Sequence, residues 1–99
     1  MLKHIVMWNF KEGLSDSQNA ENALKAKAEL EALVNYIDEI LEIKVHINHL
    51  SSSNMDIILN STFTNEKALA AYKIHPEHLR VGEFISIAFQ NRTCIDYYE

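Results

Sequence analysis

The stretch YKIHPEH, from Tyr72 to His78, decides how the second half of this 99-residue chain folds. Pro76 cannot continue a preceding helix, because it lacks an N–H group and its ring clashes with the previous turn. Proline does suit the first turn of a new helix. The stretch therefore predicts one helix that ends near His75 and another that begins at Pro76. A phenol and two imidazoles meet at this break, and imidazole exchanges protons near neutral pH. The break is therefore a candidate acid–base or binding site.

Around this break, the hydrophobic periodicity predicts four strands and further helical segments. Strands are predicted over residues 2–11, 42–49, 55–63 and 92–98, and helices from about 15–17 to 35, from 64–65 to 75 and from 76 onward. The order β-α-β-β-α-β, with the second helix broken in two, predicts an α+β, ferredoxin-like fold. Such a fold has a four-stranded antiparallel sheet with its helices on one face. No linker or low-complexity tract interrupts residues 1–99, so we predict a single domain.

The same periodicity predicts which helical residues face the sheet. In the first helix these are Leu24, Lys27, Leu30, Leu33, Val34 and Ile37. Near the break they are Ala68, Leu69 and Tyr72, and after it Leu79, Val81, Phe84, Ile85 and Phe89.

The other face of the predicted sheet has no helix to cover it. We expect Ile5, Met7, Ile58, Ile95 and Tyr97 there, mixed with polar groups. An exposed apolar patch of this kind usually marks an interface, and two-fold dimers are the commonest assemblies. We therefore expect a homodimer that forms through the sheet face.

Composition excludes several classes of partner. The formal net charge is −5 and the nine Lys and Arg residues are scattered, which argues against nucleic-acid binding. The N-terminus lacks the apolar core of a signal peptide, and no run approaches the roughly 20 apolar residues of a membrane span. Cys94 is the only cysteine, so it cannot form an internal disulfide, which fits a cytoplasmic location.

The chain resembles the stress-responsive α/β-barrel (Dabb) family of dimeric α/β barrels. The segment from Lys3 to Trp8 resembles the family's first strand, the segment from Tyr72 to Leu79 resembles its most recognisable motif, and the segment from Ile95 to Tyr97 resembles its last strand. The similarity spans essentially the whole chain. It implies a homodimer whose two sheets pack into a barrel. One plant branch, the olivetolic acid cyclases, closes a polyketide ring by acid–base chemistry, and the resemblance makes Tyr72, His78 and His4 the candidate working residues.

His78 is the main candidate for a general base, since a neutral imidazole accepts protons from acidic carbons or hydroxyls. Asp96 of the last strand is expected on the same side of the sheet as Cys94 and His4, where it would hold the tautomer of His78. The alternative is a structural His–Asp hydrogen bond that ties helix to sheet.

Tyr72 would donate a hydrogen bond to a developing oxyanion. Its alternative is a core aromatic whose hydroxyl is satisfied at the rim of a pocket. For His4 the alternative to a functional role is a satisfied core group.

The remaining candidates have plainer interpretations. His75 is expected to cap the broken helix, and the His75-x-x-His78 spacing is too weak to predict a metal site. We therefore predict no metal and no cofactor. His46 and His49 are expected at the surface, and Cys94 is expected to be a small buried hydrophobe. Four aromatic side chains are candidates either for the wall of a cavity or for plain core: Trp8, Phe63, Phe84 and Phe89.

Four functions remain open on the sequence alone. The first is a dimer whose cavity binds a small, largely apolar molecule. The second is an acid–base enzyme of the cyclase, lyase or isomerase type that uses His78 and Tyr72 on a carbonyl compound. The third is a monooxygenase such as the haem-degrading relatives in the wider superfamily, whose working set is an asparagine, a tryptophan and a histidine. It is disfavoured because Trp8 and Asn9 are neighbours and point to opposite faces of a strand. The fourth is a structural dimer in which side chains fill the space between helix and sheet.

Overall fold

The computed structural model describes residues 1–99, and its elements follow the predicted order. They are β1 (Leu2–Phe10), α1 (Asp16–Glu31) with the 3-10 turn η1 (Ala32–Asn35), β2 (Glu42–His46), β3 (Ile57–Phe63), α2 (Glu66–Ile74), α3 (Pro76–Ala88) and β4 (Phe89–Tyr98). Four strand limits differ from the predictions, since β1 ends at Phe10, β2 ends at His46, β3 begins at Ile57 and β4 begins at Phe89.

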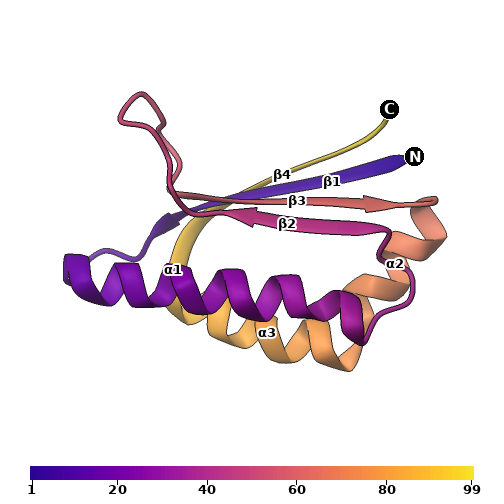
Figure 1. Cartoon of the computed structure of the whole chain (residues 1–99), viewed down its shortest axis with the longest axis horizontal. Coiled ribbons are helices and arrows are strands. Elements are labelled where there is room, and N and C mark those ends of the chain that lie inside the picture. The colour runs from indigo at the N-terminus through magenta and orange to yellow at the C-terminus, as the bar shows by residue number, and fades with distance from the viewer.

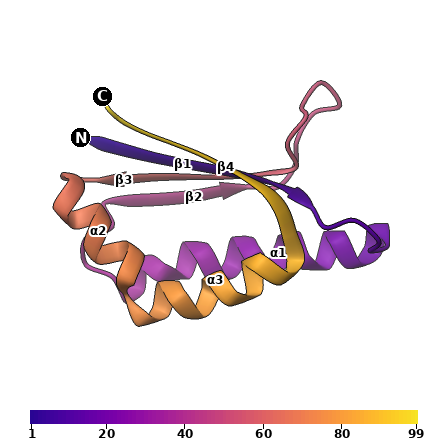
Figure 2. The ribbon, with the colours of Figure 1, turned by 180° about the vertical axis from the view of Figure 1, so that it is seen from behind.

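The four strands form one antiparallel sheet in the order β2-β3-β1-β4. Figures 1 and 2 show α1 and α3 lying together beneath one face of the sheet, while no helix covers the other face. Helix α2 lies at the end of the sheet where both termini are found (Figure 1). The predicted ferredoxin-like α+β fold is confirmed.

Helices α1 and α2 each begin at a side-chain cap. The Ser15 hydroxyl accepts a hydrogen bond from the Gln18 amide at 3.1 Å, and Asn65 Oδ1 accepts one from the Ala68 amide at 3.0 Å. Each cap satisfies an amide that the first turn of a helix leaves without a partner. None of the helices combines the length and the apolar character needed to cross a membrane.

The core lies between the helices and one face of the sheet. Alternate residues of β1 supply much of it, because Leu2, His4, Val6 and Trp8 are buried on the helix side. Ile57, Leu59 and Phe63 of β3 lie beside them.

The inward face of α1 differs from the prediction. Ala23, Ala26 and Leu30 are buried, whereas Leu24 is 62% exposed. Small alanine side chains let the helix lie close to the sheet, and this turns the larger leucine toward solvent. Val34 and Leu79 are exposed as well, so their predicted inward orientation is wrong.

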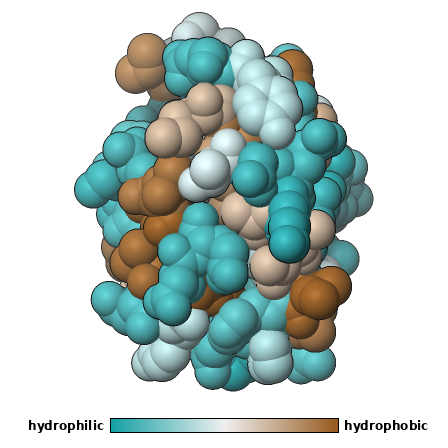
Figure 3. All heavy atoms as spheres, turned by 90° about the vertical axis from the view of Figure 1, so that its right-hand side faces the viewer, coloured by the Kyte–Doolittle hydropathy of each residue, from teal (hydrophilic) through white to brown (hydrophobic).

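The uncovered sheet face carries the apolar residues that were expected there. Ile5 of β1 pairs with Ile95 of β4, and Met7 pairs with Ile58 of β3. Ile95 is 56% exposed and Tyr97 is 42% exposed. Seen from the end that carries α2 and both termini, hydrophobic side chains reach the surface in a band broken by hydrophilic ones (Figure 3).

A β-bulge interrupts the pairing of β1 with β4. Asn9 pairs with Gln90 and Met7 pairs with Thr93, so two residues, Asn91 and Arg92, stand opposite Trp8 alone. Asn91 has a φ of 56°, a left-handed conformation that asparagine tolerates better than most residues. The extra residue reverses the alternation of β4. It therefore puts Cys94 and Asp96 on the helix side and Ile95 and Tyr97 on the open side.

This bulge generates a prediction at Asn91. We expect Asn91→Gly to be more stable than Asn91→Ala by about 1 kcal/mol, because glycine adopts positive φ without a steric penalty. Urea unfolding at fixed protein concentration measures the difference. At neighbouring Gln90, whose φ is not positive, the order should reverse, with Ala more stable than Gly. The same order at both positions would contradict the left-handed bulge.

Candidate functional site

The break between α2 and α3 is capped by His75. Its backbone is extended, with φ −63° and ψ 135°, as the residue before a proline prefers. Its Nδ1 accepts a hydrogen bond from the Glu77 amide at 3.1 Å, within the first turn of α3. The expectation that His75 caps the broken helix is confirmed.

The break also orients His78. In an unbroken helix the Lys73 carbonyl would accept from the Glu77 amide four residues later, but that amide is engaged by His75. The carbonyl instead accepts a hydrogen bond from His78 Nδ1 at 3.0 Å. Because a carbonyl can only accept, Nδ1 carries the proton and His78 Nε2 is left as an acceptor. The imidazole lies against the Tyr72 ring, with the two ring centroids 4.3 Å apart.

His4 is oriented by the last strand. His4 and Asp96 are direct cross-strand partners, and His4 Nδ1 donates to Asp96 Oδ1 at 2.5 Å. Since an ionised carboxylate only accepts, the His4 proton is on Nδ1 and its Nε2 is an acceptor. The prediction that Asp96 holds the tautomer of His78 is therefore wrong, because its partner is His4. The predicted placement of His4, Cys94 and Asp96 on one side of the sheet is confirmed.

His4, Tyr72 and His78 line one cavity between the helices and the sheet, with a volume of about 290 Å³. Apolar side chains form most of its wall, namely Val6, Trp8, Leu30, Leu59 and Ile85. Polar residues of β4 complete it, together with Ser86 of α3: Gln90, Asn91 and Arg92. Side chains therefore do not fill this space, contrary to what a purely structural dimer would require.

Tyr72 combines full burial with an unsatisfied hydroxyl. Its side chain is 0% exposed, and its hydroxyl has no hydrogen-bond partner in the protein. Burial raises the pKa of this phenol, which keeps it a neutral donor at physiological pH. A buried unpaired hydroxyl costs about 1–3 kcal/mol. Tyr72 is therefore not the rim-satisfied core aromatic of the alternative interpretation.

Burial favours the neutral form of both imidazoles. Burial lowers the pKa of His78, and burial also lowers the pKa of His4, although the hydrogen bond to Asp96 opposes this effect. The residues that line the cavity therefore include two imidazoles, each with a free Nε2 acceptor, and one hydroxyl donor. Such a set can accept a proton and stabilise an oxyanion.

One group of possible metal ligands lies beside the cavity. The donor atoms of His4, Cys94 and Asp96 lie within 4.8 Å of one another. The His4–Asp96 hydrogen bond already engages two of them, and the charges of Lys73 and Arg92 act on His4. Burial and the Asp96 charge raise the pKa of the Cys94 thiol, which disfavours the thiolate that metals bind. A shared proton suits this cluster better than a cation.

Cys94 itself is exposed, so its predicted burial is wrong. The terminal part of β4 is an edge strand that the helices do not cover, which leaves the residue accessible on the helix side.

The four candidate aromatic residues divide between cavity and core. Trp8 lines the cavity, whereas Phe63 and Phe89 are buried core residues. Phe84 is partly buried and lies beneath the Lys25 ammonium, which is 4.4 Å from the ring centroid.

Trp8 and Asn9 do point to opposite sides of β1. Trp8 is buried beneath the sheet, while the Asn9 side chain donates to the Asn54 carbonyl and to Asp56. They cannot act together in one pocket, which argues against the arrangement expected of a haem-degrading monooxygenase.

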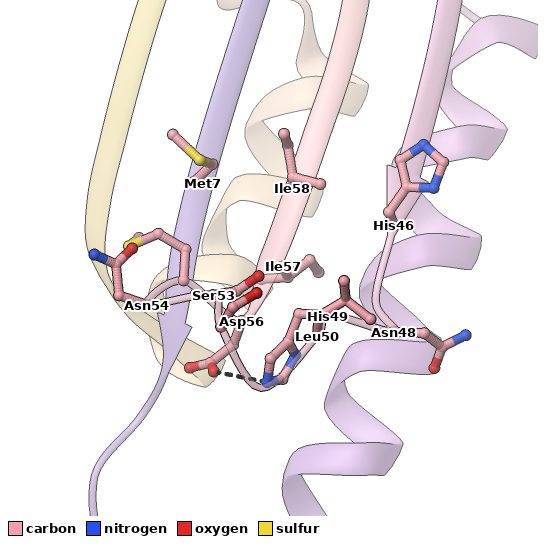
Figure 4. Close-up of a pocket in the computed structure, with 12 residues that line it drawn as sticks. Met7, His46, Asn48, His49, Leu50, Ser53, Asn54, Asp56, Ile57 and Ile58 are labelled. Carbon is pink, nitrogen blue, oxygen red and sulfur yellow. Dashed lines mark ion pairs between the residues drawn. The ribbon is translucent and has the colours of Figure 1, made fainter.

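A larger hollow of about 460 Å³ lies at the connection between β2 and β3, away from these residues (Figure 4). In Figure 4 Met7, Ile58 and His46 stand on the open face of the sheet, and His49 pairs with Asp56 at 3.5 Å. His46 and His49 are both exposed, as expected. We favour the smaller cavity as the site because the buried unpaired hydroxyl and both oriented imidazoles lie there.

The polar residues that β4 contributes to the cavity are not among those predicted from the sequence, namely Gln90, Asn91 and Arg92. Two signals were present. Asparagine is common at backbone positions with positive φ, and an arginine shares the alternation of Cys94 and Asp96. Neither signal gives the position of the bulge unless the register of β4 against β1 is known.

The chain belongs to the Dabb family, the stress-responsive A/B barrel domain, whose sequence profile matches residues 2–99. Its structure is similar to that of a dimeric protein of unknown function with a ferredoxin-like fold from Bacteroides fragilis. The two share 28% identity with a TM-score of 0.93, over 99% of this chain and 95% of that one. The family resemblance seen in the sequence is confirmed.

Two more distant structures share the fold alone. A protein of Arabidopsis thaliana is 24% identical with a TM-score of 0.83, over 100% of this chain and 95% of that one. A hydroxynitrile lyase from Passiflora edulis is 20% identical with a TM-score of 0.76, over 97% and 90% of the two chains. No protein of curated function matches the sequence.

The His4–Asp96 bond generates a prediction for Asp96→Asn. Because the Asp96 hydrogen bond and charge both raise the pKa of His4, their loss should lower that pKa further. The titration of His78 should move little, since Asp96 is not among the groups that shift its pKa. NMR titration of the histidine rings measures both values. Asp56→Asn, which removes the carboxylate beside His49, serves as the control. A shift in the pKa of His78 without a shift in the pKa of His4 would instead support the predicted contact between Asp96 and His78.

Proposed function

We propose that this protein is a homodimer whose subunits each bind a small, largely apolar molecule in the cavity between the broken helix and the sheet. The observation that carries the proposal is Tyr72, which lines a mostly apolar cavity and whose buried hydroxyl has no partner in the protein. Folded proteins rarely leave such a group unpaired, so it calls for an explanation such as a functional role. A ligand oxygen would satisfy it.

The homodimer is supported by the open sheet face and by relatives. Ile5, Met7, Ile58, Ile95 and Tyr97 lie on that face without a helix to cover them. The Bacteroides fragilis protein is described as dimeric, as are similar structures from Thermobifida fusca and Jannaschia. Pairing of two such faces would bury the apolar residues of both subunits.

A charge on this face should separate the subunits. We expect Ile95→Asp to give a monomer at micromolar concentration, because each interface would bury two carboxylates without partners. Sedimentation equilibrium measures the molecular mass. Ile87→Asp, on the outer side of α3 where Ile87 is 73% exposed, should leave the dimer intact. A wild-type protein that sediments as a monomer would refute the proposed assembly.

The cavity favours a ligand with an apolar body and a carbonyl oxygen. Its wall is mainly aliphatic and aromatic, while the Tyr72 hydroxyl is a neutral donor suited to a carbonyl acceptor. The volume of about 290 Å³ is at the small end of the usual range for ligand sites.

A second candidate function is acid–base catalysis on such a carbonyl compound. His78 Nε2 would accept a proton from the bound molecule, Tyr72 would stabilise the resulting oxyanion, and His4 would supply a second acceptor held by Asp96. The fold accommodates enzymes, since similar structures are described as a hydroxynitrile lyase and an antibiotic biosynthesis monooxygenase. The pair of neutral, oriented imidazoles favours proton transfer over oxygenation.

Tyr72→Phe tests the binding proposal. Removing the unpaired hydroxyl should stabilise the free protein by roughly 1 kcal/mol in urea unfolding. It should also weaken the binding of small aromatic ketones about tenfold, because a hydrogen bond to the carbonyl is lost. Tyr36→Phe, at a tyrosine that is 58% exposed, should change neither quantity. If Tyr72→Phe is less stable than the wild type and binds ketones equally well, the Tyr72 hydroxyl is neither unpaired nor a ligand contact.

His78→Ala separates binding from catalysis. An enzyme should lose about 10²–10⁴-fold in turnover of its carbonyl substrate when its base is removed. The circular dichroism spectrum should be unchanged, since His78 lies near the surface of α3. If His78→Ala turns over every carbonyl compound tested as fast as the wild type does, only the binding function remains.

A further inference from the structure

We propose that Arg92 makes the cavity selective for a small amphiphilic carboxylic acid, whose carboxylate it binds while the apolar body fills the interior. This inference rests on the proposed function and names the ligand class of the same cavity. Arg92 lines the cavity with Gln90 and Asn91 on β4. No carboxylate lies among the lining residues, so Arg92 is the one permanently charged side chain there.

The charge of Arg92 is not neutralised elsewhere in the chain. The other arginine of the chain, Arg80, binds both Glu77 and Glu29 at 3.0 Å. Arg92 makes no ion pair and no side-chain hydrogen bond, although the chain has 14 acidic residues against nine basic ones. A guanidinium has five donors arranged to match a carboxylate. Arg92 is exposed, so its unpaired guanidinium is free to bind a carboxylate at the mouth of the cavity.

The backbone directs Arg92 to this position. The bulge at Asn91 places two residues of β4 opposite Trp8 and switches the following residues to the helix side. Without the extra residue, Arg92 would share the open sheet face with the proposed dimer contact. Its side chain lies close enough for its charge to act on His4, Tyr72 and His78.

The ligand would therefore meet three kinds of group in one cavity. Arg92 binds the carboxylate, Val6, Leu30, Leu59 and Ile85 contact the apolar body, and the Tyr72 hydroxyl donates to a further oxygen. Lysine or arginine residues on the outer surface would not produce this combination, because they lack the adjoining apolar wall.

The test compares two ligands of nearly equal shape. The wild-type dimer should bind para-butylbenzoate about tenfold more tightly than the neutral para-butylbenzamide, as befits a charge-assisted hydrogen bond. Fluorescence of Trp8, the single tryptophan and a cavity residue, reports occupancy. Added salt should weaken binding of the acid but not of the amide.

Substitutions locate the selectivity. Arg92→Gln should abolish the preference for the acid, and Arg92→Lys should retain part of it. Arg80→Gln removes the same charge from α3, outside the cavity, and should keep the full preference. Equal binding of acid and amide to the wild type, or a preference that survives in Arg92→Gln, would overturn this inference and leave the cavity proposal standing. Binding of neither compound would overturn both.

Discussion

The rest of the site depends on the amide hydrogen that Pro76 lacks. Helix α2 must end before it, His75 takes the extended backbone that precedes a proline, and its ring caps α3 by accepting from Glu77. The Lys73 carbonyl thereby loses its helical donor and accepts from His78 Nδ1 instead. The Lys73 carbonyl, left without its helical donor, thus forms the hydrogen bond that fixes the tautomer of His78 and holds its ring against Tyr72.

A second irregularity, in the sheet, completes the cavity. The bulge at Asn91 shifts β4 by one residue against β1, so that Asp96 stands opposite His4 and Arg92 reaches the helix side. The same shift sends Ile95 and Tyr97 to the open face. The polar chemistry of the cavity and the apolar character of the proposed dimer contact therefore have a common origin. Both irregularities cost local backbone stability, which is usual where a fold supports a site.

Much of this arrangement follows from the sequence, and the failures have physical causes. Periodicity and the proline give the element order, and parity along the strands places His4 with Asp96. The alternation of side chains along a strand does not show which residue of a helix each one contacts. For this reason the sequence predicts a contact of Asp96 with His78 rather than with His4. The prediction of which face of α1 is buried is wrong because that face consists largely of alanines, and the more hydrophobic Leu24 lies on another face. The contribution of Arg92 depended on a bulge that only strand pairing reveals.

The central claim is that His4 and His78, which line the cavity with Tyr72, are both neutral, carry their protons on Nδ1 and keep Nε2 as an acceptor. Long-range ¹H–¹⁵N NMR of the histidine rings at pH 7.5 measures this directly. The account predicts the Nδ1–H tautomer for both residues, in contrast to His75, whose Nδ1 is an acceptor. An Nε2–H tautomer or a fully protonated ring at His4 or His78 would contradict it, because that residue would then have no free Nε2 acceptor.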